Sequence, residues 1–230
     1  MKVLKQQKAD ILHMEKIPKI VYKIWLGNNE MPEHFEKYVD TWRSVLGPKW
    51  AIHPIGNTIV PEIADRPCVK WCIDSGNYTV LNHYVRYYLL YNFGGVYMDL
   101  DVEMFRPFDF KSGLIIGMES ERWINNHCII SDPGHKLMED CMDWMDYMDF
   151  GMPEIELSTG PRLVSNLIYM HTNFKYRFLD QPYLTHYKGS ILTVMPERCL
   201  SGHRWYQKYD PKEVKNDTYC VHHYNHSWKK

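Results

Sequence analysis

The block GGVYMDLD, residues 94–101, constrains the fold more than any other part of the chain. Its paired glycines permit a tight turn, and the three residues after them have the character of a short buried strand. Asp99 and Asp101 then stand at i and i+2, a spacing that points both carboxylates the same way where a strand continues. Such a block delivers two acidic side chains to the end of a strand, where open α/β sheets bind their ligands.

The residues before this block predict a helix that leads into the glycine turn. Over residues 79–92, apolar side chains recur with the spacing of one helical face: Leu81, Tyr84, Val85, Tyr88 and Leu89. Gly94 stands where a left-handed C′ residue would end that helix. His83 and Arg86 lie three residues apart, so we expect them to share a helix face beside the apolar stripe.

The acidic pair is a candidate metal site. Neighbouring carboxylates are costly to hold together unless a cation neutralises them, and oxygen ligands suit Mg²⁺ or Mn²⁺, which keep positions open for substrate phosphates. A solvated acidic turn is the competing interpretation. An EF-hand loop is excluded, because it needs Gly at its sixth and Glu at its twelfth position, where counting from Asp99 gives Met104 and Phe110.

The rest of the chain alternates strand and helix patterns. An apolar run over residues 20–26, a helix bracketed by Pro32 and Gly47, and a strand over 50–55 predict one βαβ unit. Further strands are expected over 114–118, 127–131, 191–194 and 219–222, and further helices over 133–148 and 161–170. We therefore expect an α/β fold in which a Rossmann-like mixed sheet with flanking helices forms one domain over residues 1–230.

Composition excludes several classes of function. The 27 basic and 28 acidic residues nearly balance, so no global field favours nucleic acid as a partner. Residues 1–16 are polar and mixed, and no later stretch reaches the length of a membrane span. We expect a soluble cytoplasmic protein without a transmembrane segment, at most peripheral to the inner face of the membrane.

Six cysteines in a chain of this length do not indicate a disulfide scaffold. Cys68 and Cys72 are four residues apart and would share a helix face, as two ligands of a zinc site could. A second pair of ligands at suitable spacing is not found nearby, so two buried thiols are the favoured interpretation.

With these residues in view, the chain resembles the DXD-containing glycosyltransferases of family 32. That group includes capsular-polysaccharide enzymes, initiating mannosyltransferases of yeast and, more distantly, the glucosylating domains of large clostridial toxins. The resemblance runs over about residues 17–228 and is most specific in RYYLLYNFGGVYMDLD, residues 86–101. Looser matches are IPKIVYKIWLG at 17–27, Asn125-Asn126, Pro133-Gly134-His135, Thr159-Gly160-Pro161 and HHYNHSW at 222–228. It implies a GT-A fold, a nucleotide-sugar donor, a divalent metal and retention of anomeric configuration.

The resemblance also implies roles for individual residues. Asp101 is expected to bind the metal directly, and Asp99 to reach ribose or sugar hydroxyls and the metal shell. Arg86 would hold sugar hydroxyls or a phosphate oxygen, although a surface salt bridge is its alternative. Trp25, followed by Leu26, matches the position where an indole stacks on the base, and a core tryptophan is the alternative. Asn126 would lie near the anomeric carbon, unless it only forms a turn.

The C-terminal residues are candidates for closing the site. Either His222 or His223 could complete the metal shell, and because neighbours in a strand point to opposite faces, only one of them can do so. We favour His223. Ser227 and Trp228 match the segment that closes over the diphosphate, while a frayed, solvated end is the alternative.

One departure from the family bears on donor choice. The family usually has Ser-Asp three to four residues before the arginine that is Arg86 here, and that aspartate binds sugar hydroxyls, whereas this chain has Asn82-His83. We predict a metal-dependent, retaining glycosyltransferase that uses Mn²⁺ or Mg²⁺ and a nucleotide-diphospho-sugar, with UDP expected, to extend a glycan, a polysaccharide or a lipid-linked saccharide. His83 keeps open a sugar-nucleotide-binding protein without turnover. A phosphoryl hydrolase is a third possibility, but a nucleophile for it is not evident.

Overall fold

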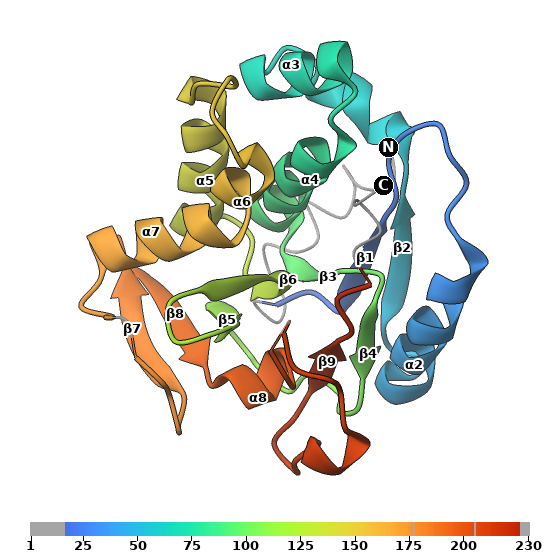
Figure 1. The fold of residues 1–230 in the computed structure, drawn as a ribbon, viewed down its shortest axis with the longest axis vertical. Helices are drawn as coiled ribbons and strands as arrows, with labels where there is room; N and C mark the ends of the chain where they lie inside the picture. The colour runs from blue at the N-terminus through green and yellow to red at the C-terminus, as the bar shows by residue number, and fades with distance from the viewer. Residues whose placement is uncertain (1–16, 176, 205, 226–230) are drawn as a thin grey trace.

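The computed structural model describes residues 17–175, 177–204 and 206–225, and Figure 1 shows their arrangement. Among these residues the main sheet has seven strands in the order β2-β1-β3-β6-β5-β8-β7, and a small sheet pairs β4 with β9. The strands are β1 Ile20–Ile24, β2 Ala51–Ile55, β3 Gly95–Met98, β4 Val102–Met104, β5 Leu114–Met118, β6 Ile124–Ser131, β7 Tyr183–Tyr187, β8 Ser190–Met195 and β9 Cys220–His222.

The main sheet is mixed, as expected. Strands β1, β2, β3, β5 and β8 run parallel to one another, whereas β6 and β7 run antiparallel to them. The carboxyl ends of the five parallel strands therefore lie along one edge of the sheet. That edge is where open α/β sheets bind ligands, and the Asp-x-Asp turn follows β3 there.

Helices cover both faces of the sheet. The helices are α2 Glu36–Leu46, α3 Pro67–Ser75, α4 Tyr78–Phe93, α5 Lys136–Tyr147, α6 Ile155–Thr159, α7 Pro161–His171 and α8 Glu197–Leu200, with 3-10 turns η2 Glu33–Phe35, η3 Asn57–Glu62 and η4 Pro211–Glu213. Helices α3, α4, α5 and α7 pack on one face, and α2, α8 and the β4–β9 pair on the other (Figure 1). Alternate residues of each strand face the two cores, as in Val96 and Tyr97.

The two glycines between α4 and β3 are required by close contacts. Gly94 and Gly95 have φ of +64° and +99°. A Cβ on Gly94 would lie 2.8 Å from the carbonyl oxygen of Ser131, and one on Gly95 would lie 2.9 Å from the carbonyl oxygen of Ile20. Backbone therefore approaches backbone at both positions, and the expected glycine turn is confirmed. The ψ of −161° puts Gly94 outside the left-handed helical region expected for it, in a region of φ and ψ that is essentially restricted to glycine.

Most of the elements expected from the sequence are present, including the unit β1-α2-β2 with parallel strands. Strands β4 and β7 were not expected, because three residues after a turn and the exposed, mixed YLTHY at the sheet edge show no sustained apolar run. Cys68 and Cys72 lie on α3 as buried free thiols, which is the favoured interpretation. Across the described ranges, no helix is both long and apolar enough to span a membrane.

Candidate active site

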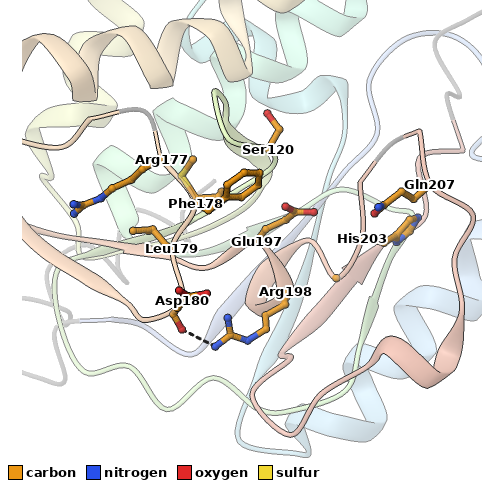
Figure 2. Close-up of a pocket in the computed structure, with 11 residues that line it drawn as sticks. Ser120, Arg177, Phe178, Leu179, Asp180, Glu197, Arg198, His203 and Gln207 are labelled. Atoms are coloured by element: carbon orange, nitrogen blue, oxygen red, sulfur yellow. Dashed lines mark hydrogen bonds between the residues drawn. The ribbon is translucent and has the colours of Figure 1, made fainter.

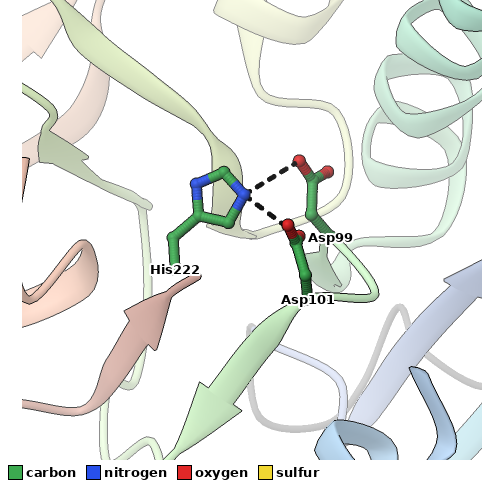
Figure 3. Close-up of side chains that lie close together, drawn as sticks. All are labelled: Asp99, Asp101 and His222. Carbon is green, nitrogen blue, oxygen red and sulfur yellow. Dashed lines mark hydrogen bonds and ion pairs between the residues drawn. The ribbon is translucent and has the colours of Figure 1, made fainter. Parts of the chain in front are cut away.

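The acidic pair lies on a turn between β3 and β4. The backbone N–H of Asp99 donates to the carbonyl oxygen of His127 at 2.8 Å, and the N–H of Val102 donates back to the carbonyl oxygen of Asp99 at 3.1 Å. The main-sheet strand thus ends one residue before the pair. The two carboxylates nevertheless converge, and they do so on the imidazole of His222 (Figure 3).

His222 comes to the pair because β9 lies antiparallel to β4, with His222 opposite Val102. Its Nε2 lies 3.0 Å from Asp101 Oδ1 and 3.8 Å from Asp99 Oδ2. Potential ligand atoms of Asp99, Asp101 and His222 all lie within 4.8 Å of one another. The ring of His127 stacks on that of His222, with centroids 4.1 Å apart, so packing also fixes the imidazole.

The prediction that His223, and not His222, faces the acidic pair is wrong. His223 Nε2 lies 2.8 Å from Glu103 Oε2, and its ring stacks on Tyr38 with centroids 4.8 Å apart. The β4–β9 pairing sets which imidazole faces the aspartates, and that pairing is not visible in the sequence. Of the closing segment, Ser227 and Trp228 lie outside the described residues.

Electrostatic interactions hold Asp101 and His222 in their charged forms. Burial opposes ionisation of Asp101, but the charge and hydrogen bond of His222 and the backbone N–H of Asn225, at 2.8 Å, keep the pKa of Asp101 well below its ordinary value. Burial likewise opposes protonation of His222, yet Asp101 and then Asp99 raise the pKa of His222 above its ordinary value. The side chains therefore form a buried, mutually stabilised ion cluster.

Arg86 is buried beneath Asp99 and is not a surface salt bridge. Its guanidinium donates to the carbonyl oxygen of Asn126 at 2.5 Å and to Asn82 Oδ1 at 2.7 Å, and it lies 3.3 Å from Asp99 Oδ1. The Tyr97 ring stacks under the guanidinium at 4.0 Å, and its hydroxyl bonds Asp99 Oδ1. Arg86 therefore holds the carboxylate of Asp99 in position.

Asn126 is buried near the start of β6, so the expectation of a mere turn residue does not hold. Its Oδ1 accepts from the Tyr87 hydroxyl at 3.0 Å. Its Nδ2 is buried without a hydrogen-bond partner among the described residues. An unsatisfied buried donor at the ligand-binding edge of a sheet is a candidate for a substrate contact.

His83 lies against the same corner of the site. Its Nδ1 is 2.9 Å from Thr159 Oγ1, and Gly160 leaves room for its ring, because a Cβ on that glycine would lie 2.8 Å from His83 Cε1 and 3.3 Å from Asn126 Nδ2. Burial and the charge of Arg86 hold the pKa of His83 well below its ordinary value, so the ring is neutral. A neutral imidazole can offer one donor or acceptor to a ligand.

Trp25 and Leu26 follow β1 on the same edge of the sheet. Leu26 is buried, whereas Trp25 is half-buried. The indole Nε1 donates to the carbonyl oxygen of Asn29 at 2.7 Å, and the ring centroid lies 6.2 Å from that of Phe35. The loop after β1 therefore holds an indole that is only partly buried and that a hydrogen bond keeps in place.

Sequence reasoning missed several residues of the site, namely Asn82, Tyr97, Glu119, His127, Asn225 and, as the preferred imidazole, His222. Glu119 follows β5, so the rule that ligands bind beyond the carboxyl ends of strands could have found it. Burial raises the pKa of Glu119 to about 7; the charge of His222 opposes that shift, and Asp99 adds to it. His127, His222 and Asn225 reach the site through contacts between distant segments, which leave no local signal, whereas Asn82 and Tyr97 contact Arg86 and Asp99 at helix and strand spacing.

The comparisons with known proteins agree with this geometry. Residues 64–128 match the model of the glycosyltransferase sugar-binding region containing a DXD motif. Inositol phosphoceramide mannosyltransferase 1 of Schizosaccharomyces pombe is 24% identical over 173 residues, which cover 66% of this chain and 51% of the relative. The chain thus spans about half the length of that relative.

A solved structure supports the fold alone. The PaToxG glycosyltransferase shares 16% sequence identity and superposes with a TM-score of 0.58, covering 74% of this chain and 76% of that one. The Asp-x-Asp turn that ends β3 falls within the matched sugar-binding region. The chain therefore has a GT-A-like fold and carries, over residues 64–128, a region similar to the DXD-containing sugar-binding region of glycosyltransferases.

Proposed function

We propose that the chain is a metal-dependent, retaining glycosyltransferase, and that it moves a sugar from a nucleotide diphosphate, expected to be UDP, to a glycan or a lipid-linked saccharide. The observation that carries the proposal is the convergence of Asp99, Asp101 and His222 within 4.8 Å at the carboxyl edge of the sheet. Few structural roles need two carboxylates held that close together.

The donor set fits a divalent cation. Two carboxylates and one imidazole suit Mn²⁺, and Mg²⁺ would rely mainly on the oxygens. The ligands must be deprotonated to bind. The low pKa of Asp101 meets that need, whereas the raised pKa of His222 means that a bound ion must displace its proton. A bound ion would supply Lewis-acid stabilisation of the diphosphate leaving group. Asp101 and His222 would hold it from the β3–β4 turn and from β9, while Asp99 would be held in place by Arg86 and Tyr97.

The remaining residues have distinct tasks in this proposal. Trp25 packs against the base, with Leu26 beneath it in the core. The unpartnered Nδ2 of Asn126 donates to the donor sugar or a phosphate oxygen, and His83 contacts a sugar hydroxyl through its free ring edge. Ser227 and Trp228 keep their assignment from the family resemblance. A cytoplasmic location, at most at the inner face of a membrane, is part of the same proposal.

Experiments are needed to identify the donor sugar and the acceptor. Because the fission yeast relative is an inositol phosphoceramide mannosyltransferase, mannose and a phosphoinositol lipid join the candidates. A thermal-shift screen should therefore include GDP-mannose beside UDP-glucose, UDP-galactose and the UDP-N-acetyl sugars, each with Mn²⁺ and with a chelator. A ligand that binds the native state raises its melting temperature, so the donor should stand out only in the presence of the metal.

Turnover is then tested with Asp101→Asn and with Asp40→Asn, an exposed carboxylate on α2, as the matched control. Release of the nucleotide should be lost in the first variant and kept in the second. If Asp101→Asn retains more than about a tenth of the wild-type kcat, a barrier change below about 1.4 kcal/mol, the metal role is wrong. Binding of a donor without any nucleotide release would favour the sugar-nucleotide-binding protein.

A further inference from the structure

A cleft of about 290 Å³ opens beside the acidic site. Its lining includes Met118 at the end of β5, Ser120 just after it, Glu197 on α8, Phe178, His203 and Gln207 (Figure 2). It therefore lies beyond the carboxyl ends of β5 and β8, on the same edge of the sheet as the Asp-x-Asp turn. None of the roles assigned above uses these residues.

The order of the strands separates this cleft from the nucleotide side. In the sheet order β2-β1-β3-β6-β5-β8-β7, the turn with Asp99 follows β3, Trp25 follows β1 on one side, and the cleft follows β5 and β8 on the other. A donor that stacks its base near Trp25 and places its diphosphate at Asp99 would extend its sugar toward the cleft. The cleft thus stands where a second substrate would meet the donor.

The cleft and the acidic cluster share a wall. The ring of Tyr224 lies 4.1 Å from the ring of His222 and 5.5 Å from that of His203, measured between centroids. Glu119 lies between the cleft residues Met118 and Ser120. The charges of His222 and Asp99 both act on the pKa of Glu119. Only the ring of Tyr224 would therefore separate a ligand in the cleft from the acidic cluster.

Within the part of the chain that the structure describes, the lining has one buried polar atom without a partner and one exposed aromatic ring. His203 is only 5% exposed, and its Nδ1 has no hydrogen-bond partner among the described residues. Phe178 is 61% exposed, so its ring is accessible to a ligand in the cleft. The guanidinium of Arg204 lies 4.9 Å from that ring and steadies it. Ser120, Gln207 and Glu197 add a hydroxyl, an amide and a carboxylate to the lining, and the carboxylate is paired with Arg204 at 3.1 Å.

We propose that this cleft is the acceptor subsite and takes a terminal saccharide unit or a similar cyclic polyol. A flat aromatic ring and convergent polar groups match a molecule with an apolar face and many hydroxyls. Its volume lies at the small end of the roughly 300–1,000 Å³ typical of ligand pockets, which suits one ring better than a long chain. This inference rests on the proposed function.

The transfer step is balanced without a further reactant. An acceptor hydroxyl oxygen bonds the anomeric carbon of the donor sugar, while the bond from that carbon to the diphosphate oxygen breaks. The electron pair of the broken bond leaves with the diphosphate, which also takes the hydroxyl proton. The cleft residues orient the hydroxyl and hold the acceptor ring, so their loss should affect the acceptor and not the donor.

Two activities of the same enzyme test the assignment. Hydrolysis of the donor without acceptor reports the donor and metal site, and transfer to a panel of methyl glycosides and myo-inositol reports the cleft. Phe178→Ala should raise the acceptor KM about tenfold, equal to about 1.4 kcal/mol, with donor hydrolysis unchanged. Tyr147→Ala, a 90% exposed ring on α5, is the matched control and should change neither activity. An unchanged acceptor KM in Phe178→Ala, or an equal loss of both activities, overturns the proposal.

Binding of the same acceptor panel gives a readout that needs no turnover. Saturation-transfer NMR on the protein with UDP and diamagnetic Mg²⁺ should show contacts to at least one glycoside in the wild type and weaker contacts in Phe178→Ala. If no panel member binds the wild type, the saccharide subsite is wrong even where the donor is hydrolysed. If the wild type binds a glycoside but neither binds nor hydrolyses any nucleotide sugar, the cleft assignment stands and the proposed function fails.

Discussion

His222 Nε2 lies 3.0 Å from Asp101 Oδ1, although the two residues are 121 positions apart in the chain. The contact joins the last described strand, β9, to the turn after β3. Asn225 reinforces it, because its backbone N–H donates to Asp101 Oδ2 at 2.8 Å. The C-terminal segment is therefore a structural part of the acidic site and not an appendage to it.

Replacing this imidazole should weaken metal binding. We expect His222→Ala to lower the affinity for Mn²⁺ at least about tenfold, since even groups that only support a metal ligand contribute that much. Isothermal titration of Mn²⁺ measures the change. His223→Ala is the matched control, because its side chain contacts Glu103 and Tyr38 instead. Equal losses in both variants would contradict the assignment of His222.

The contrast between these two histidines shows which parts of the site a sequence can predict. Asp99 follows a local pattern of helix, glycine turn and strand, so its place at the end of β3 was expected. The choice between His222 and His223 depends on the pairing of β9 with β4, and a three-residue strand carries too little periodicity to be read. Tyr97 differs, because it stands two residues before Asp99, and the strand period could have placed its hydroxyl beside that carboxylate.

Arg86→Lys should impair catalysis without unfolding the protein. Lysine keeps the charge but cannot reproduce the fork that reaches Asn126, Asn82 and Asp99 together. We expect kcat/KM for the donor to fall at least about tenfold, or about 1.4 kcal/mol. Steady-state kinetics and a melting curve on the same sample measure both effects. Arg43→Lys, an exposed ion pair on α2, is the control and should leave both values unchanged. Full activity in Arg86→Lys would show that the fork is not needed.

Trp25→Ala separates two roles of one indole. If the ring stacks on the base, affinity for UDP should fall by about 1–3 kcal/mol, as in base–aromatic stacking generally. If the ring serves mainly to pack near Phe35, the melting temperature should drop while the affinity per folded molecule is kept. We expect the first result, because the ring is only half-buried. Calorimetric titration with UDP and a melting curve decide between them.

Gly94→Ala should destabilise the fold more than Gly134→Ala. Both glycines have a positive φ, +64° and +76°, so both variants carry backbone strain of about 1–3 kcal/mol. Only at Gly94 would the new Cβ meet other atoms, 2.7 Å from Pro133 Cδ and 2.8 Å from the carbonyl oxygen of Ser131, whereas no atom lies within 4 Å at Gly134. The difference in free energy of unfolding, measured with urea, should be about 1–3 kcal/mol. Equal values would mean that the turn can shift to admit a methyl group.

His135 should make the stability of the protein depend on pH. The residue is the N-cap of α5, where its Nδ1 accepts from the backbone N–H of Leu137 at 3.3 Å and its Nε2 lies 3.0 Å from the carbonyl oxygen of Ile191. These contacts need the neutral ring with its proton on Nε2, because a proton on Nδ1 would abolish the cap. Burial lowers the pKa of His135 from 6.5 to about 4, against the opposing hydrogen bond to Ile191.

The sign of the pH effect follows from this lowered pKa. Between pH 6.5 and about 4 the unfolded chain binds a proton at His135 and the folded chain does not, so stability falls as the pH is lowered through this window. The loss should reach about 3 kcal/mol at its lower end. His135→Asn keeps a capping oxygen but does not titrate. Urea unfolding across this range should therefore give a shallower pH dependence in the variant than in the wild type, while the other buried histidines contribute equally to both. Parallel curves would show that His135 is protonated as readily in the folded protein as in the unfolded chain.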